Sequence, residues 1–173
     1  MKRKPAPLVI FASSRGEGNT RAALMAVQEE RDFEIVDLSA LNISYFDYEH
    51  ANADDDFIPL AEKMREHEVI ILVTPVYWYT MSALMKTFLD RWSDLLTIRK
   101  DLGRGLKGKW VYVISSYGTA YPVGFDDPFR LTCDYMGMHF GGSLHHYCGK
   151  DPVYLEQNVR NIRSFQQLID SHD

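Results

Sequence analysis

The chain has 173 residues, of which 46% are hydrophobic and 25% are charged, a balance typical of globular proteins that favours a single domain over residues 1–173. Its formal net charge is −5 without a basic stripe, so nucleic acid is not expected as a partner. No segment approaches the roughly 18 apolar residues that a membrane span needs. The apolar run after the basic start is too short for a secretory signal. We therefore expect a cytoplasmic protein without membrane contacts.

The first part of the chain alternates two apolar runs with an amphipathic segment. Residues 8–12 form a continuous apolar run, as in a strand buried on both faces. Residues 19–30 carry apolar side chains at helical spacing, and Asn19 is the expected N-cap of that helix. A second strand is expected over residues 33–38, and the polar segment 39–56 is interpreted as a solvated loop.

The middle of the chain contains the strongest strand signal. An acidic run, residues 54–56, precedes a helix predicted over residues 57–66, where negative charge suits the helix N-terminus. Residues 69–74 (VIILVT) are predicted to form a strand. After the loop PVYWYTM, Ser82 is the expected N-cap of a long helix whose apolar side extends to Leu96.

The last third of the chain repeats the alternation. A glycine-rich basic connector over residues 99–109 leads to a strand predicted over residues 110–115. A helix is expected over residues 126–136, then a fifth strand over 138–147 and a closing helix over 152–169. The side of the closing helix expected to face the core carries Val159, Ile162, Phe165, Leu168 and Ile169.

Strands that alternate with helices imply parallel strands joined by right-handed crossovers. We predict an α/β fold: a flavodoxin-like three-layer sandwich with a five-stranded parallel sheet in the order 2-1-3-4-5. A fragment of a dinucleotide-binding fold is the alternative. Both folds place ligands at the carboxyl ends of the strands.

The cysteines and the adjacent histidines predict no metal site. Cys133 and Cys148 are interpreted as free thiols rather than a disulfide or a metal pair, because no Cys or His stands at ligand spacing from them. His145 and His146 follow one another on an expected strand, so their side chains should point to opposite faces.

In the predicted sheet order, the exits of the first, third and fourth strands are neighbours, and all three carry unusual loops. The first, SSRGEGNT, offers hydroxyls, an amide, a guanidinium and backbone N–H groups at a helix start, where the dipole favours an anion. We therefore predict a phosphate site there. Its expected residues are Ser13, Ser14, Arg15, Gly18, Asn19 and Thr20.

Other phosphate motifs fit this loop less well. A P-loop needs a Lys after its glycines, and none stands there. A dinucleotide fingerprint needs a third glycine at the position of Arg21. Asp37 stands at a plausible distance for a ribose contact, so the dinucleotide alternative is weakened rather than excluded.

The second loop, PVYWYTM, is aromatic, and such side chains either pack on their own protein or form a platform for a flat ligand. Beside an anion site the platform is favoured, because one molecule with a phosphate at one end and a flat ring at the other would fit both loops. FMN is such a molecule. The loop after the fourth strand is expected to bracket the ring through Ser115, Ser116, Tyr117, Gly118 and Thr119.

Two segments, SSRGEGNT and TPVYWYTMSALMKTFLDRW, resemble the corresponding motifs of the NADPH-dependent FMN reductase family, and the resemblance covers about residues 7–120. It implies a phosphate loop formed by Ser13, Arg15, Gly18, Asn19 and Thr20. It implies a ring-binding stretch formed by Pro75, Val76, Tyr77 and Trp78, and a second ring loop over residues 115–119. Ala12 departs mildly from the Gly-Ser start of many relatives.

The resemblance implies that NAD(P)H reduces bound FMN by two-electron hydride transfer and that the electrons pass to a flavin, a quinone or a similar small molecule. The flavin performs the chemistry, so no catalytic side chain is expected. The ring loops contain no Asp or Glu, which favours two-electron chemistry. A homodimer or higher homo-oligomer is implied, and the helix with Phe88, Trp92 and Leu95 is a candidate interface. A flavodoxin-type one-electron carrier and a non-catalytic binding module stay open as alternatives.

Overall fold

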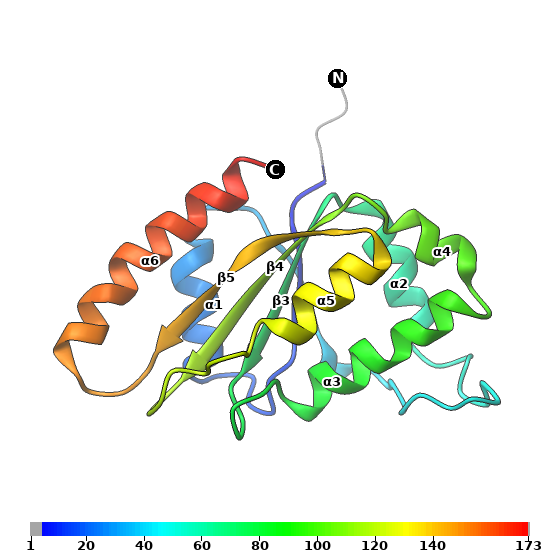
Figure 1. The fold of residues 1–173 in the computed structure, drawn as a ribbon, viewed down its shortest axis with the longest axis horizontal. Helices are drawn as coiled ribbons and strands as arrows, with labels where there is room; N and C mark the ends of the chain where they lie inside the picture. The colour runs from blue at the N-terminus through cyan, green and yellow to red at the C-terminus, as the bar shows by residue number, and fades with distance from the viewer. Residues whose placement is uncertain (1–4, 173) are drawn as a thin grey trace.

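The strands of the computed structural model, which describes residues 5–172, form one parallel sheet in the order β2-β1-β3-β4-β5 (Figure 1). Their bounds are Leu8–Phe11 for β1, Glu34–Asp37 for β2, Val69–Pro75 for β3, Trp110–Tyr117 for β4 and His139–Tyr147 for β5. The predicted sheet order is therefore confirmed. Residues 1–4, the basic start considered above, and residue 173 lie outside the described residues.

Helices cover both faces of this sheet and complete the predicted three layers (Figure 1). The helices are α1 Asn19–Gln28, α2 Phe57–Glu66, α3 Ala83–Asp90, α4 Lys100–Gly105, α5 Asp127–Met136 and α6 Pro152–Asp170. Two 3₁₀ segments are η1 Leu38–Ala40 and η2 Arg91–Leu96. One face of the sheet packs against α1 and α6, and the other packs against α2, α3 and α5.

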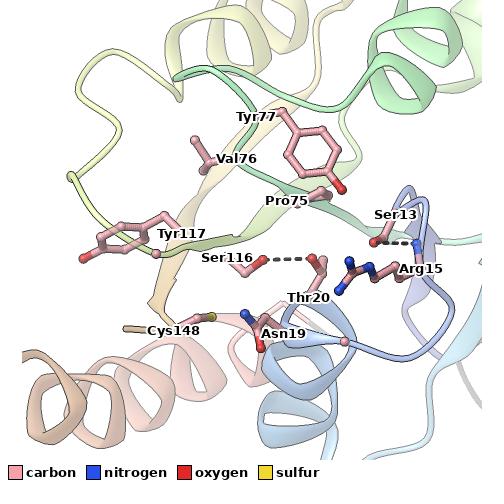
Figure 2. Close-up of a pocket in the computed structure, with 12 residues that line it drawn as sticks. Ser13, Arg15, Asn19, Thr20, Pro75, Val76, Tyr77, Ser116, Tyr117 and Cys148 are labelled. Atoms are coloured by element: carbon pink, nitrogen blue, oxygen red, sulfur yellow. Dashed lines mark hydrogen bonds between the residues drawn. The ribbon is translucent and has the colours of Figure 1, made fainter. Parts of the chain in front are cut away.

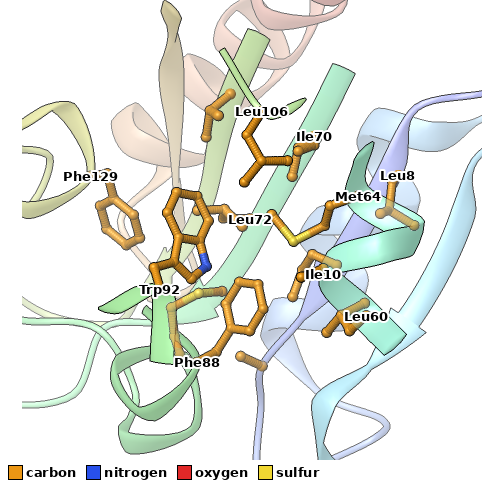
Figure 3. Close-up of a cluster of buried hydrophobic side chains, with 14 of the residues drawn as sticks. Leu8, Ile10, Leu60, Met64, Ile70, Leu72, Phe88, Trp92, Leu106 and Phe129 are labelled. Atoms are coloured by element: carbon orange, nitrogen blue, oxygen red, sulfur yellow. The ribbon is translucent and has the colours of Figure 1, made fainter. Parts of the chain in front are cut away.

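The central strands are buried on both faces because helices lie on each side of them. Every residue of β3 is buried, and successive side chains go to opposite layers. Ile70 and Leu72 pack in the cluster that contains Phe88 and Trp92 (Figure 3), whereas Ile71 packs toward α1 and α6. Burying one such side chain contributes about 1.5–3 kcal/mol. This two-sided burial explains why the strands read as continuous apolar runs.

Several helix boundaries differ from the predictions. The N-cap of α1 is Gly18 rather than Asn19, and no side chain of the described residues caps this helix. Ser82 caps α3 as predicted, accepting a hydrogen bond from the Met85 N–H at 3.2 Å, but the helix is shorter than expected and continues as η2. The segment 99–109, interpreted as a connector, contains α4, which the glycines in its sequence obscured.

Two further predictions are wrong: the buried side of α6 and the end of β4. Val159 and Leu168 were expected to face the core but are 52% and 44% exposed, because α6 presents only a narrow side with Phe165 and Ile169 to the sheet. β4 extends beyond its predicted end to Tyr117, since its last residues continue to pair with β5.

Part of the acidic run before α2 is buried rather than solvated. The Asp55 side chain is only 4% exposed and forms an ion pair with the fully buried Arg91. The Arg91 Nε donates to Asp94 at 2.8 Å, and the His50 Nδ1 lies 2.8 Å from the other oxygen of that carboxylate. This network ties the segment between η1 and α2 to η2 through the buried Asp55 side chain, whereas much of the rest of the segment faces solvent, as Tyr45 and Tyr48 do at 79% and 86% exposed.

Candidate functional site

The carboxyl ends of β1, β3 and β4 meet around a cavity of about 360 Å³, a volume in the range of small-molecule sites (Figure 2). In open α/β sheets, ligands occupy this position, where neighbouring strands are followed by connections that diverge. The cavity is lined by Ser13, Arg15, Gly18, Asn19, Thr20, Pro75, Val76, Tyr77, Ser116, Tyr117, Gly118 and Cys148.

The β1–α1 loop supplies hydrogen-bond donors to one end of the cavity. The buried Ser13 hydroxyl accepts a hydrogen bond from the Arg15 N–H at 3.3 Å, which shapes the loop. Because α1 begins at Gly18 without a side-chain cap, the N–H groups of its first turn are open toward the cavity, where the helix dipole favours negative charge. Among the described residues of the cavity wall, Arg15 is the charged one. This end suits a phosphate group.

Two side-chain hydrogen bonds join loops that are far apart in the sequence. Thr20 of α1 and Ser116 of β4 share a buried bond of 2.8 Å between their hydroxyl oxygens (Figure 2). Ser14 and Tyr77 share a bond of 3.0 Å. The sheet register also places Pro75 beside Ser116. The three loops predicted to act together are therefore in direct contact.

The N-cap residue of α3, Ser82, holds the start of the β1–α1 loop by a hydrogen bond. The Ser82 hydroxyl donates to the backbone oxygen of Ala12 at 2.8 Å, and the Thr74 hydroxyl donates to the Ser82 Oγ at 3.1 Å. All of these groups are buried. Ser82 therefore does more than cap α3: its hydroxyl also holds the exits of β1 and β3 together.

Trp78 and Tyr79 occupy the two central positions of a tight turn after β3. The turn is closed by the Tyr77 N–H donating to the Thr80 oxygen at 2.9 Å and by the reverse bond at 3.1 Å. Both central residues have positive φ angles, 49° and 67°, as in a type I′ turn, where Asn and Gly are favoured. This backbone costs a side-chain-bearing residue about 1–2 kcal/mol. The turn leaves Trp78 93% exposed, whereas Tyr77 faces the cavity.

Tyr117 lies on the side of the cavity away from Arg15 (Figure 2), and Gly118, the next residue, also lines the wall. The Tyr117 ring packs 5.5 Å from that of Tyr147. Burial, followed by the neighbouring phenols, raises the pKa of Tyr117 above its ordinary value, so the phenol stays neutral. An uncharged aromatic side chain beside a glycine suits the flat end of a ligand.

Some residues predicted for the site do not line the cavity. The Ser115 side chain is fully buried and lies 2.6 Å from the His145 Nδ1, because alternation along the extended β4 sends it to the sheet face opposite Ser116. Ser14 turns its hydroxyl to Tyr77 instead. The predicted residues outside the wall are Ser14, Trp78, Ser115 and Thr119. Their direct contact with a cofactor stays a prediction.

Cys148, predicted only to be a free thiol, also lines the cavity. It follows β5, and its N–H donates to the Tyr117 oxygen at 2.8 Å. A signal was available, because the predicted sheet order places the exit of β5 beside the exit of β4. Burial raises the pKa of this thiol above its ordinary value, so the side chain adds a small neutral group to the wall.

The remaining titratable residues show no metal-binding arrangement. Within residues 5–172, no three side chains of His, Cys, Asp or Glu lie close enough together to hold a metal ion. His145 and His146 lie on opposite faces of β5, since His145 bonds Ser115 on the α5 side. Of the helices in the described part of the chain, none combines the length and apolar character of a membrane span.

The sheet order, together with a cavity at these strand exits, defines a protein of the flavodoxin-like class. Solved structures share this fold. The Trp repressor binding protein from Bacillus subtilis superposes with a TM-score of 0.74 at 23% identity, covering 96% of this chain and 99% of its own. General stress protein 14 from Treponema denticola, in complex with FMN, superposes with a TM-score of 0.66 at 18% identity, covering 98% and 100%.

Sequence comparison identifies the family. The model of the NADPH-dependent FMN reductase family matches residues 7–147, and the chain belongs to this family. In Bacillus subtilis (strain 168), the NAD(P)H-dependent FMN-containing oxidoreductase YwqN is 30% identical over 152 residues, 78% of this chain and 80% of YwqN. The NAD(P)H oxidoreductase YrkL of the same strain is 29% identical over 160 residues, 83% of each chain. The predicted family is confirmed, and with it FMN as cofactor and NAD(P)H as co-substrate.

Proposed function

We propose that this chain transfers a hydride from NAD(P)H to FMN held in the cavity and passes two electrons to a flavin, a quinone or a similar small molecule. The supporting observation is that the uncapped start of α1 and the aromatic exits of β3 and β4 line one cavity, and that α1 and β4 are joined there by the 2.8 Å Thr20–Ser116 bond. When bound, FMN supplies the redox chemistry. The protein binds the cofactor, orients it and sets the charge around it.

The donor set of the β1–α1 loop fits the phosphate end of FMN. The Arg15 guanidinium, the Asn19 amide and the open N–H groups after Gly18 all lie on the cavity wall. Each donates hydrogen bonds, and the first carries positive charge. These residues would hold the phosphate.

The opposite walls fit a flat ring. Pro75, Val76 and Tyr77 form one side, and Tyr117 with Gly118 forms another. A side chain added at Gly118 would meet no atom within 4 Å, so the backbone there is open to close approach by a ligand. These residues would hold the isoalloxazine ring and leave one of its faces accessible to NAD(P)H.

The charges around the cavity favour two-electron chemistry. Carboxylates beside a flavin would penalise its reduced anion, and the described wall contains none. The acidic residues that follow the third loop are paired elsewhere: Asp126 lies 3.3 Å from the His145 Nε2, and Asp127 accepts a bond from Arg130 at 3.0 Å. The structure thus offers little to oppose hydride transfer.

A homo-oligomer and a cytoplasmic location are also proposed. Phe88, Trp92 and Leu95, the predicted interface, are buried within the protomer and cannot supply one. An interface would instead use the neighbouring exposed face with Leu131 and Tyr135, which are 57% and 77% exposed. Analytical ultracentrifugation of the wild type and of a Leu131→Asp variant tests this proposal, which requires the variant to dissociate.

The phosphate assignment is tested by comparing FMN with riboflavin, which lacks the phosphate. The variant Arg15→Ala/Asn19→Ala should bind FMN at least about tenfold more weakly, because it loses charge-assisted hydrogen bonds. Its affinity for riboflavin should stay near that of the wild type. The control variant Arg163→Ala changes an exposed arginine of α6 and should bind both flavins normally. Equal losses for FMN and riboflavin would refute the assignment.

The reaction is tested by anaerobic stopped-flow mixing of the FMN-loaded protein with NADPH or NADH. Rapid bleaching of the flavin absorbance by either nucleotide is the expected result. A one-electron carrier would keep its flavin oxidised on this timescale. A non-catalytic binding module would be purified without colour and would not take up FMN.

A further inference from the structure

His145, on β5, lies outside the cavity wall but contacts residues of β4 and of the start of α5, the two elements that flank the connection over residues 118–125. Its Nδ1 lies 2.6 Å from the Oγ of Ser115, which belongs to β4, three residues before that connection begins. Its Nε2 lies 3.3 Å from the Oδ1 of Asp126, the N-cap residue of α5. Ser143 completes the cluster, donating to the Asp126 Oδ2 at 2.6 Å and lying 3.2 Å from the same Nε2. The imidazole therefore links the two elements that flank residues 118–125.

The middle of the connection also packs on this imidazole. The Tyr121 ring meets it edge-on at 5.4 Å, and the Phe125 ring does so at 5.5 Å. The His145 side chain is only 8% exposed. Tyr121 in turn contacts the Tyr117 ring at 6.0 Å, and Tyr117 lines the cavity. Movement of the connection would therefore reach the cavity wall through Tyr117.

The Asp126 carboxylate contacts His145 and Ser143 and does not cap the adjacent helix α5. Asp126 is the N-cap residue of α5, yet its side chain makes no capping hydrogen bond. Burial by itself opposes ionisation, but the contacts with His145 and Ser143 outweigh it and hold the pKa of Asp126 below its ordinary value. The ionised carboxylate is thus hydrogen-bonded to Ser143 at 2.6 Å and lies 3.3 Å from the imidazole, which connects the start of α5 to β5.

We propose that His145 is a positioning residue that holds residues 118–125 in place at the ring end of the cavity. It acts through Ser115 and Asp126 and does not itself contact the cofactor. The link to flavin binding rests on the proposed function, whereas the effect on the connection itself does not.

The test compares His145→Phe with His139→Phe. The first keeps an aromatic ring against Tyr121 and Phe125 but loses both polar contacts, and the second changes an exposed histidine at the other end of β5. In FMN-free protein, the Val123 and Phe125 amides, which donate to backbone oxygens at 2.9 and 3.0 Å, should exchange hydrogen about tenfold faster in His145→Phe, since a buried polar partner is lost. The control should exchange at the wild-type rate.

Flavin binding supplies the second measurement. His145→Phe should lower the affinity for FMN and the affinity for riboflavin by the same factor, about tenfold, because the ring end of the cavity is disturbed and the phosphate end is not. It should also alter the visible circular dichroism of the bound flavin ring. His145→Gln retains an amide donor for Asp126 and should recover most of the affinity. A loss confined to FMN, or equal defects in the Gln and Phe variants, would overturn the proposal.

Two other outcomes can be told apart from a wrong role for His145: misfolding of the variant, and a protein that does not bind flavin. If His145→Phe does not fold, Asp126→Asn weakens the same contact more gently and should raise exchange of the Val123 and Phe125 amides about threefold. If the wild type binds neither flavin, the proposed function is wrong. The exchange rates in the FMN-free protein then decide the role of His145, and unchanged rates would refute it.

Discussion

Replacing Arg91 with Met tests whether the buried ion network secures the segment between η1 and α2. The Arg91 side chain is fully buried, and its Nε donates to Asp94 at 2.8 Å. One of its terminal nitrogens bonds Asp55 and the Ser44 backbone oxygen, and the other donates to the Asn52 oxygen at 3.3 Å. Met replaces the aliphatic stem but leaves two buried carboxylates without their cation.

The expected loss at pH 7 is about 3–5 kcal/mol of unfolding free energy, the range found when one partner of a buried ion pair is removed. For a chain of this length, that loss corresponds to a fall in Tm of about 6–20 °C. Asp55 and Asp94 have side chains only 4% and 1% exposed, so water cannot replace the lost guanidinium.

The loss should also depend on pH. Burial by itself raises the pKa of Asp55, but hydrogen bonds from Arg91 and from two backbone N–H groups outweigh it and hold the pKa below its ordinary value. In the wild type, Asp55 therefore stabilises the fold above the unfolded-state pKa of about 3.9, and this contribution is lost as pH falls through the lower folded-state value. Without Arg91, the two backbone hydrogen bonds remain but the cation is lost, so the carboxyl takes up a proton at a higher pH than in the wild type. The gap between the two proteins should narrow from pH 7 toward pH 4.

Urea unfolding followed by tryptophan fluorescence measures both quantities, with the two proteins at the same FMN saturation because ligand adds stability. Arg99→Met, at a surface arginine paired with Glu62 and Asp101, is the control and should change stability little. Asp55→Asn combined with Arg91→Met should recover part of the loss. A loss below about 1 kcal/mol, or a gap that widens in acid, would refute the reasoning.

Three further changes test other parts of the structure. Replacing Trp78 with Asn and Tyr79 with Gly should raise the unfolding free energy by about 1–2 kcal/mol in urea titrations, since both positions have positive φ; a decrease would contradict the strain assigned to this turn. Iodoacetamide should modify Cys148 more slowly when FMN is bound, as peptide mass spectrometry can show, whereas Cys133, whose pKa burial raises to about 12, should stay unmodified throughout. Equal rates at Cys148 with and without FMN would place the flavin elsewhere. Gly103→Ala should cost about 1–3 kcal/mol, because the added Cβ would overlap a backbone oxygen of η2, and an unchanged Tm would argue against that packing.

Local patterns were sufficient to predict the elements that build the sheet. Residues 69–74 are apolar without alternation because helices cover both faces of β3, so periodicity and burial agree. The Ser82 cap was also predictable, because a serine before an apolar helix satisfies a backbone N–H locally. Asn19 was misassigned because two neighbouring residues can each begin a helix, and only the backbone geometry distinguishes them.

Side chains that depend on distant partners could not be assigned from the sequence. The buried state of Asp55 follows from Arg91, which is remote along the chain. Val159 was expected to face inward because the spacing of apolar residues shows which face of a helix turns toward the core. It does not show how many residues of that face the sheet covers, and Val159 lies beyond the covered part.

The amino-acid sequence by itself indicated the strands, the helices and the unusual loops, because hydrophobic periodicity and loop composition are local properties, and the resemblance of two segments indicated the family. The sheet order was the favoured one of two predicted arrangements, and the tertiary structure decided it. Tertiary structure decided which side chains of those loops line the cavity. The continuation of β4 turns Ser115 away from the cavity wall and toward His145, and the exit of β5 brings Cys148 onto that wall. The physical reason is that strand register and hydrogen bonds between distant segments set the direction of each side chain, and neither is encoded within a single stretch of residues.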